Sequence, residues 1–229
     1  MKLVLLPGLD GTGRLFEPFV QALPSHLSPV IISYPNDKPL SYAELVRFVK
    51  LQVPSVEDYV LLAESFSGPV AIEISATHLT NLKALVLSAT FVSNPALAPQ
   101  IMSPLLRGLF FALEPPQFVV SRYLLGKKPP LDLVETFRRA RRSVRPDVLA
   151  FRMRSVINVD VRRALAACHL PILYLCARQD RLVKTRSLAQ MKKIRPEMTI
   201  VEIEGPHLLL QREPAKCVEA IAHYLSSAL

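Results

Sequence analysis

The sequence predicts an α/β protein in which a mostly parallel six-stranded sheet has helices on both faces and a helical insertion. Three observations support this prediction. Apolar strand-like runs alternate with helical patterns, the alternation stops in one long central stretch, and turns rich in glycine, proline or small polar residues follow several runs. With 229 residues, 50% of them hydrophobic, the chain can bury one sizeable core and accommodate an insertion.

The elements follow in order from these patterns. The first strand is the apolar run at 2–6 before a glycine-rich loop, and further strands are expected near 29–34, 59–64, 84–89, 171–177 and 198–203. Helices are expected near 15–22, 41–52, 68–79, 185–194 and 213–227. Residues 93–170 read as Pro-rich turns followed by helices. We therefore expect a core of residues 1–92 and 171–229, with a helical cap insertion of 93–170.

The third strand stops abruptly at Ser65, where small residues open a helix. A serine at such a strand-to-helix turn is exposed, provided that the positions two before and two after it are small. Here those positions hold Ala63 and Ser67, followed by Gly68, so the steric requirement of G-x-S-x-G is met although the pattern is not. We interpret this turn as a nucleophile elbow with Ser65 as the nucleophile.

A serine nucleophile needs a base and a third group that orients the base. Asp180 follows the run Pro171–Ala177, and His207 follows the later strand in a Gly-Pro-His turn. Both would therefore lie at the carboxyl edge of the sheet, in the order nucleophile, acid, base. We predict a triad of Ser65, Asp180 and His207.

The loop after the first strand, Pro7 to Gly13, reads P-G-L-D-G-T-G and can turn backbone N–H groups inward. Together with the amide of Phe66, the amide of Leu9 would form an oxyanion hole for the tetrahedral intermediate. Each part also has a structural alternative, since Ser65 or His207 could cap a helix and Asp180 could be a solvated loop carboxylate. The presence of four parts at the right strand ends favours catalysis over these alternatives.

On these residues the chain resembles the α/β-hydrolase superfamily over nearly its whole length, which implies the α/β-hydrolase fold. Its loop matches the family's H-G-x-x motif at Gly8 and Leu9, with Pro7 where histidine is frequent. The stretch from Val159 to Leu225 is similar to small serine esterases and thioesterases, to C–C hydrolases and to the pimeloyl-acyl-carrier-protein methyl ester esterases. The resemblance implies a trimmed core without the antiparallel hairpin that usually opens this family.

The predicted cap holds nearly all of the charge imbalance. Residues 101–165 contain 13 Lys and Arg against 5 Asp and Glu, a net of +8 from a chain total of +9. One face of a helix beginning near Asp132 carries Arg138, Arg141, Arg142 and Arg145, and another carries Leu133, Phe137, Ala140 and Val144. The basic face is either a solvated helix surface or a docking site for an anionic substrate or an acidic acyl carrier protein.

The first half of the cap is apolar and could line a pocket for an acyl or other apolar group, or simply pack onto the core. The residues concerned are Leu105, Leu106, Leu109, Phe110, Phe111, Leu113, Phe118 and Val119.

Several protein classes are disfavoured. No motif accompanies the basic charge to indicate nucleic acid binding, and no apolar stretch has transmembrane length. Lys2 and the short apolar run after it are too brief for a signal peptide. Three cysteines without C-x-x-C spacing argue against a disulfide framework or a metal site, so we expect a cytoplasmic protein.

The predicted function is a cofactor-independent serine hydrolase that cleaves carboxylic esters or thioesters through an acyl-enzyme on Ser65. A lyase, a C–C hydrolase or an acyltransferase could use the same triad, and a non-catalytic ligand-binding protein could use the same fold. Haloalkane dehalogenases and epoxide hydrolases need aspartate at the elbow, which the serine here disfavours.

Overall fold

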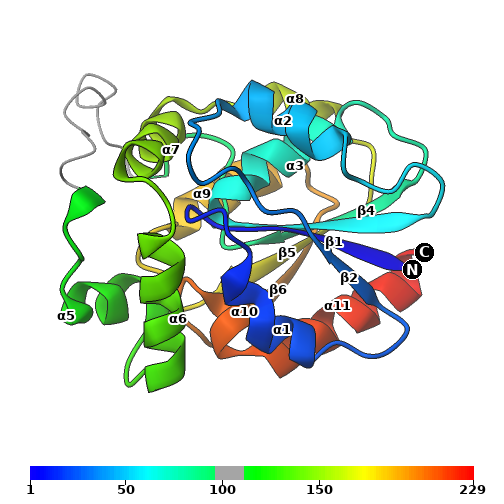
Figure 1. Cartoon of the computed structure of the whole chain (residues 1–229). Helices are drawn as coiled ribbons and strands as arrows, with labels where there is room; N and C mark the ends of the chain where they lie inside the picture. The colour runs from blue at the N-terminus through cyan, green and yellow to red at the C-terminus, as the bar shows by residue number, and fades with distance from the viewer. Residues whose placement is uncertain (96–110) are drawn as a thin grey trace.

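The computed structural model of the chain describes residues 1–95 and 111–229 (Figure 1). At its centre is a six-stranded sheet of order β2-β1-β3-β4-β5-β6, in which every neighbouring pair is parallel. The predicted α/β class and six-stranded sheet are confirmed. The strands are β1 (Lys2–Leu6), β2 (Ser28–Ile31), β3 (Tyr59–Glu64), β4 (Leu82–Ser88), β5 (Ile172–Ala177) and β6 (Thr199–Ile203).

Helices cover both faces of this sheet (Figure 1). One face packs against α2 (Tyr42–Lys50), α3 (Gly68–Ser75), α8 (Arg162–Ala167) and α9 (Thr185–Ile194). The opposite face packs against α1 (Glu17–Gln21), α10 (Leu209–Arg212) and α11 (Pro214–Ala228). Within residues 1–95 and 111–229, no helix combines the length and the apolar character that a membrane span requires.

Side chains along each central strand alternate between the two layers of the core. In β1, Val4 and Leu6 join the cluster under α2 and α3, whereas Leu3 and Leu5 join the cluster over α1 and α11. Successive side chains point to opposite faces of the sheet, and both faces are buried. Most positions of the central strands are therefore apolar, which explains the continuous apolar runs in the sequence.

Most of the described residues between β4 and β5 form a helical insertion that lies beyond the carboxyl edge of the sheet (Figure 1). Its described elements are α5 (Gln117–Val120), the π-helical turn Ser121–Leu125, α6 (Leu131–Arg142) and α7 (Pro146–Asn158). The last insertion helix, α8, instead packs against α3 on a face of the sheet, with Leu165 in the core. The part that overhangs the sheet edge is therefore shorter than residues 93–170.

Two elements end earlier than their sequence patterns suggested. The second strand stops at Ile31 rather than near residue 34, because the Tyr34 amide donates to Gly11 O at 2.7 Å and draws the chain toward the loop after β1. The helix α3 stops at Ser75 rather than near residue 79, and His78 then takes a left-handed conformation with φ 53°. The early exit after β2 brings Tyr34 under the elbow.

Candidate active site

Ser65 occupies the turn between β3 and α3 in a strained backbone conformation, with φ 49°. A non-glycine residue with positive φ is uncommon and costs energy, so the surroundings must hold it. The Thr90 hydroxyl does so by donating to Ser65 O at 2.5 Å. Gly68 makes this approach feasible, because a Cβ there would overlap the Thr90 side chain. Thr90 therefore helps to hold the backbone conformation of Ser65, a role that the sequence pattern did not reveal.

The structure brings Ser65, Asp180 and His207 together from three separate loops. The imidazole of His207 lies between the other two, with Nε2 2.8 Å from Ser65 Oγ and Nδ1 2.8 Å from Asp180 Oδ2. Because a carboxylate only accepts hydrogen bonds, Nδ1 carries the proton and Nε2 is free to accept from the serine hydroxyl. The arrangement can therefore activate Ser65 as a nucleophile.

The Asp180 carboxylate is fixed on its other side by the backbone. Its Oδ1 accepts from the amides of Leu182 at 2.8 Å and Val183 at 3.0 Å. Both Asp180 and His207 have nearly buried side chains, so little water competes with their hydrogen bond. Glu204, the nearest alternative acid in sequence, is exposed and accepts from Gln179 Nε2 instead.

The pKa of His207 results from opposing influences. Burial lowers it, but the charge and hydrogen bond of Asp180, with a smaller contribution from Glu64, raise it above its ordinary value. The Glu64 side chain is itself buried beside this site, and burial raises its pKa to about 7. Glu64 was not identified from the sequence, where it reads only as the polar residue that ends an apolar strand.

The loop after β1 lines a pocket that also contains Ser65 and His207. Leu9 and Phe66, the two residues predicted to supply oxyanion-hole amides, both line it beside Ser65 and His207. The loop is anchored by the elbow itself, since the Ser67 hydroxyl donates to Pro7 O. Ser67 Oγ in turn accepts from the Tyr34 hydroxyl at 2.6 Å. Ser67 therefore contributes hydrogen bonds as well as the small size that the elbow requires.

A pocket of about 870 Å³ opens above Ser65 and His207. Of the predicted cap residues, Phe111, Leu113 and Val119 line it. Phe118 does not line it, and its side chain is 72% exposed. The other four predicted residues, Leu105, Leu106, Leu109 and Phe110, lie outside the described residues. The lining is otherwise dominated by apolar side chains from α6, α7 and the core, including Phe91, Phe137, Leu149, Met153 and Val156.

The four predicted arginines do not form one common site. Arg141 lines the pocket, and its Nη2 donates to the carbonyls of Phe111 at 2.6 Å and Leu113 at 2.5 Å. Arg142 pairs with Glu114, and Arg145 pairs with Asp147 at 2.8 Å. Arg138 on α6 is partly buried and does not line the pocket. The predicted apolar stripe is present, with Leu133, Ala140 and Val144 buried.

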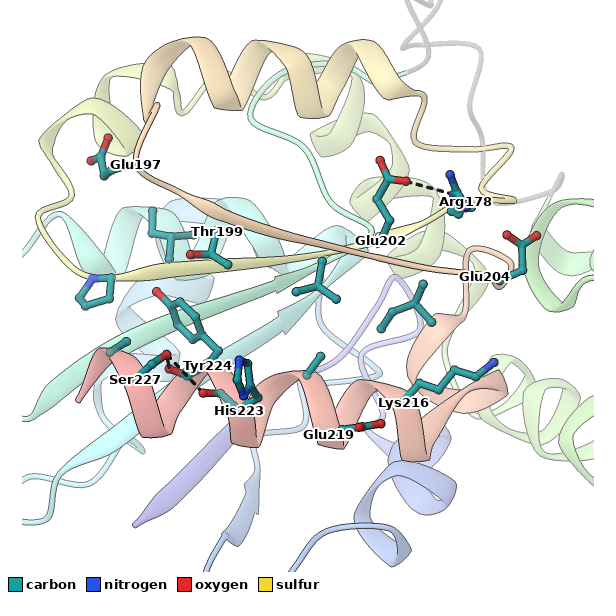
Figure 2. Close-up of a pocket in the computed structure, with 16 residues that line it drawn as sticks. Arg178, Glu197, Thr199, Glu202, Glu204, Lys216, Glu219, His223, Tyr224 and Ser227 are labelled. Carbon is teal, nitrogen blue, oxygen red and sulfur yellow. Dashed lines mark hydrogen bonds and ion pairs between the residues drawn. The ribbon is translucent and has the colours of Figure 1, made fainter.

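A second hollow of about 1000 Å³ lies between the edge strand β6 and helix α11 (Figure 2). Its walls carry Glu202, paired with Arg178 at 3.0 Å, together with Glu219 and Lys216. No residue of the Ser65, Asp180 and His207 constellation lines it. The apolar pocket over Ser65 is therefore the one that fits a reacting substrate.

A sequence profile of the Alpha/beta hydrolase family matches residues 3–220. Three solved structures are similar in fold, each at 15% identity. The enol-lactonase from Burkholderia xenovorans has a TM-score of 0.83 and covers 98% of this chain and 91% of its own. MenH from S. aureus has a TM-score of 0.80 with coverages of 100% and 94%. A lipase-esterase related protein from Clostridium acetobutylicum has a TM-score of 0.79 with coverages of 97% and 93%. No curated protein matches the chain by sequence.

Proposed function

The chain belongs to the alpha/beta hydrolase family, and from its site geometry we propose that it is a cofactor-independent serine hydrolase acting on carboxylic esters or thioesters. The observation that carries this proposal is the position of the His207 imidazole, 2.8 Å from both Ser65 Oγ and the Asp180 carboxylate. That arrangement provides a nucleophile, a general base and an orienting acid in contact with one another.

In the proposed reaction Ser65 Oγ attacks the carbonyl carbon of the substrate while its proton passes to His207 Nε2. The carbonyl oxygen becomes an oxyanion that the amides of Leu9 and Phe66 would stabilise, each donor being worth roughly 3 kcal/mol. His207 then protonates the departing alcohol or thiol, which leaves the acyl group on Ser65. A water molecule repeats the sequence, with its proton taken by His207, and releases the carboxylic acid.

The apolar pocket supports the proposal that the enzyme binds the acyl group of its substrate and that this group is apolar. Its walls are mostly aliphatic and aromatic, and burial of such a group is favourable by roughly 25 cal/mol per Å² of apolar surface. Helices α6 and α7 supply Phe137, Leu149 and Met153 to the pocket, which supports a cap role for the insertion.

We further propose that basic residues of the cap, Arg138 above all, favour an acidic substrate or acyl carrier protein.

The site residues alone do not separate an esterase from a lyase, a C–C hydrolase or an acyltransferase with the same triad. A non-catalytic binding protein would have no use for the hydrogen-bonded serine.

Cys168, Cys176 and Cys217 are unpaired, which supports a reducing compartment such as the cytoplasm.

A fluorophosphonate probe tests the proposal most directly, because it reacts only with an activated serine. We expect stoichiometric labelling of the wild-type chain and none of Ser65→Ala. A substrate panel of p-nitrophenyl esters, acyl-coenzyme A and acyl-carrier-protein thioesters would then define the leaving group. A folded wild-type chain that resists the probe and hydrolyses no member of the panel would contradict the proposed function.

A further inference from the structure

Arg152 on α7 is the largest fully buried side chain of the described residues, only 2% exposed. A buried guanidinium is costly unless its donors are satisfied. Its hydrogen bonds go to three backbone carbonyls rather than to a carboxylate. Nη1 donates to Leu9 O at 3.0 Å and to Asp10 O at 2.6 Å, and Nη2 donates to Pro35 O at 2.9 Å. Two of these three carbonyls belong to the loop that would supply an oxyanion-hole amide.

Every carbonyl from Pro7 to Asp10 accepts a hydrogen bond. Pro7 O accepts from the Ser67 hydroxyl, and Gly8 O accepts from the Gly11 amide at 3.0 Å. The remaining two are the carbonyls held by Arg152. The insertion thus holds two of these four carbonyls, the elbow holds one, and the loop itself holds the fourth.

These bonds determine where the loop amides point. In a trans peptide the C=O and N–H groups are antiparallel, so fixing the carbonyl fixes the amide on the opposite side. Arg152 fixes the peptide plane between Asp10 and Gly11, whose amide holds Gly8 O. Gly8 O shares its plane with the amide of Leu9. The orientation of the Leu9 amide therefore depends on Arg152 through two linked peptide planes.

We propose that Arg152 is a positioning residue that sets the oxyanion-hole amide of Leu9 from within the insertion, an inference that rests on the proposed hydrolase function. Its positive charge, which has only neutral carbonyls as hydrogen-bond partners, also polarises the loop peptides in the direction that favours negative charge on the substrate oxygen. The insertion would then contribute to catalysis as well as to the pocket wall.

The surroundings of Arg152 match this role. The guanidinium lies over the Tyr34 ring at 5.7 Å from its centroid, and Tyr34 bonds to Ser67 of the elbow. Gly11 has φ +71° and leaves space that a Cβ would take from the guanidinium. Only arginine offers a planar set of donors that reaches three carbonyls at once, because a lysine ammonium is a single point.

A merely structural arginine would lower stability without changing the chemistry of the folded enzyme. The test therefore compares Arg152→Met and Arg152→Lys with the control Arg163→Met, an exposed arginine of the same insertion. For each variant, kcat and KM for p-nitrophenyl butyrate are measured below the onset of thermal unfolding. The inhibition constant of a trifluoromethyl ketone, which forms a tetrahedral oxyanion on serine, is measured in parallel.

We expect Arg152→Met to lower kcat by roughly 10- to 100-fold with little change in KM, because small displacements of a catalytic donor have costs of this size. The affinity for the trifluoromethyl ketone should fall by a similar factor, since it reports transition-state stabilisation. Arg152→Lys should be intermediate, and Arg163→Met should resemble the wild type.

Wild-type kcat and ketone affinity in folded Arg152→Met would overturn the inference while leaving the hydrolase proposal intact. Should that variant fail to fold, Arg152→Lys decides, and wild-type values for both quantities in it would overturn the inference. A folded wild-type chain that neither reacts with the fluorophosphonate probe nor hydrolyses any member of the substrate panel would instead overturn the hydrolase proposal, and the inference with it.

Discussion

The Gln211 amide donates to Glu64 Oε2 at 3.3 Å, which holds a buried carboxyl beside the His207 imidazole. The second oxygen, Glu64 Oε1, has no hydrogen-bond partner within the described part of the chain. A carboxylate so poorly solvated favours its neutral form, which agrees with a pKa raised to about 7 by burial. The charges of Glu64 and His207 therefore influence one another, since the Glu64 charge raises the pKa of His207 and the His207 charge opposes the rise in the pKa of Glu64.

The first prediction concerns the pH profile of kcat/KM. The rate should rise with pH as His207 loses its proton, with a midpoint above the ordinary histidine value because the pKa of His207 is raised. Glu64→Gln removes a negative charge that favours the imidazolium, so the midpoint should move to lower pH. The apparent values belong to the coupled pair. Glu73→Gln on α3 is the matched control and should leave the profile unchanged, whereas an unshifted profile in Glu64→Gln would contradict the assignment.

The second prediction concerns stability. Because the folded-state pKa of Glu64 is raised from 4.5 to about 7, the neutral carboxyl stabilises the fold at low pH, and this contribution is lost as pH rises through 7. Its size is up to ~3 kcal/mol. Urea unfolding of the wild type and Glu64→Gln at pH 4.5 and pH 8 should show a smaller loss of unfolding free energy in the variant. Equal losses in both proteins would argue against a buried titrating Glu64.

The third prediction separates the two serines of the elbow. Ser65→Ala should lower kcat by roughly 10⁴-fold or more, because the nucleophile is lost. Ser67→Ala should keep a measurable rate, reduced by the missing hydrogen bond to Pro7 O that anchors the loop. Steady-state hydrolysis of a p-nitrophenyl ester measures both. An inactive Ser67→Ala together with an active Ser65→Ala would place the nucleophile elsewhere.

The fourth prediction addresses the acid. Asp180→Asn should lower kcat by roughly 10⁴-fold, since an amide at this position favours the wrong imidazole tautomer. The folded state should persist, because the asparagine oxygen can still accept from the Leu182 and Val183 amides. Circular dichroism would verify the fold. Glu204→Gln is the control and should behave as the wild type, and the reverse result would identify Glu204 as the acid.

The sequence predicted the sheet and the meeting of Ser65, Asp180 and His207 because both depend on local signals. An apolar run followed by a small or polar turn marks the carboxyl end of a parallel strand, and these ends share one edge. The orientation of each side chain within that edge does not follow from such signals. The turn that exposes Ser65 forms only where the neighbouring residues are small. Ala63 and Gly68 meet this requirement and are visible in the sequence itself.

The supporting residues were missed because their roles depend on contacts between distant segments. Arg152 lies in an arginine-rich helical stretch whose pattern resembles a solvated basic surface, yet its partners Leu9 and Asp10 are more than a hundred residues away. Glu64 and Thr90 likewise act through tertiary neighbours. A signal was nevertheless present for Arg152, since it is flanked by the apolar residues Phe151 and Met153.

The fifth prediction concerns the basic residues of α6 and the turn after it. Arg142 and Arg145 are paired with Glu114 and Asp147, and Arg141 bonds to two backbone carbonyls. Arg138, half-buried on α6, is the member of the set for which the described residues show no ion pair, so we expect it to contribute most to the attraction of an acidic partner. Association with an acyl carrier protein should weaken as salt rises, because exposed charges are screened beyond roughly 8 to 10 Å at physiological ionic strength. A neutral short-chain ester should be nearly indifferent to salt.

The double variant Arg138→Glu and Arg142→Glu tests the same charges without changing the solvent. At low salt it should lower kcat/KM for an acyl-carrier-protein substrate and leave the neutral ester unaffected, since neither side chain lines the pocket. Reversing Arg142 also leaves Glu114 facing a like charge, which makes the local potential more negative still. Wild-type kcat/KM for both substrates in this variant would mean that the basic residues are a solvated helix surface, and an acidic carrier protein would then lose its physical support.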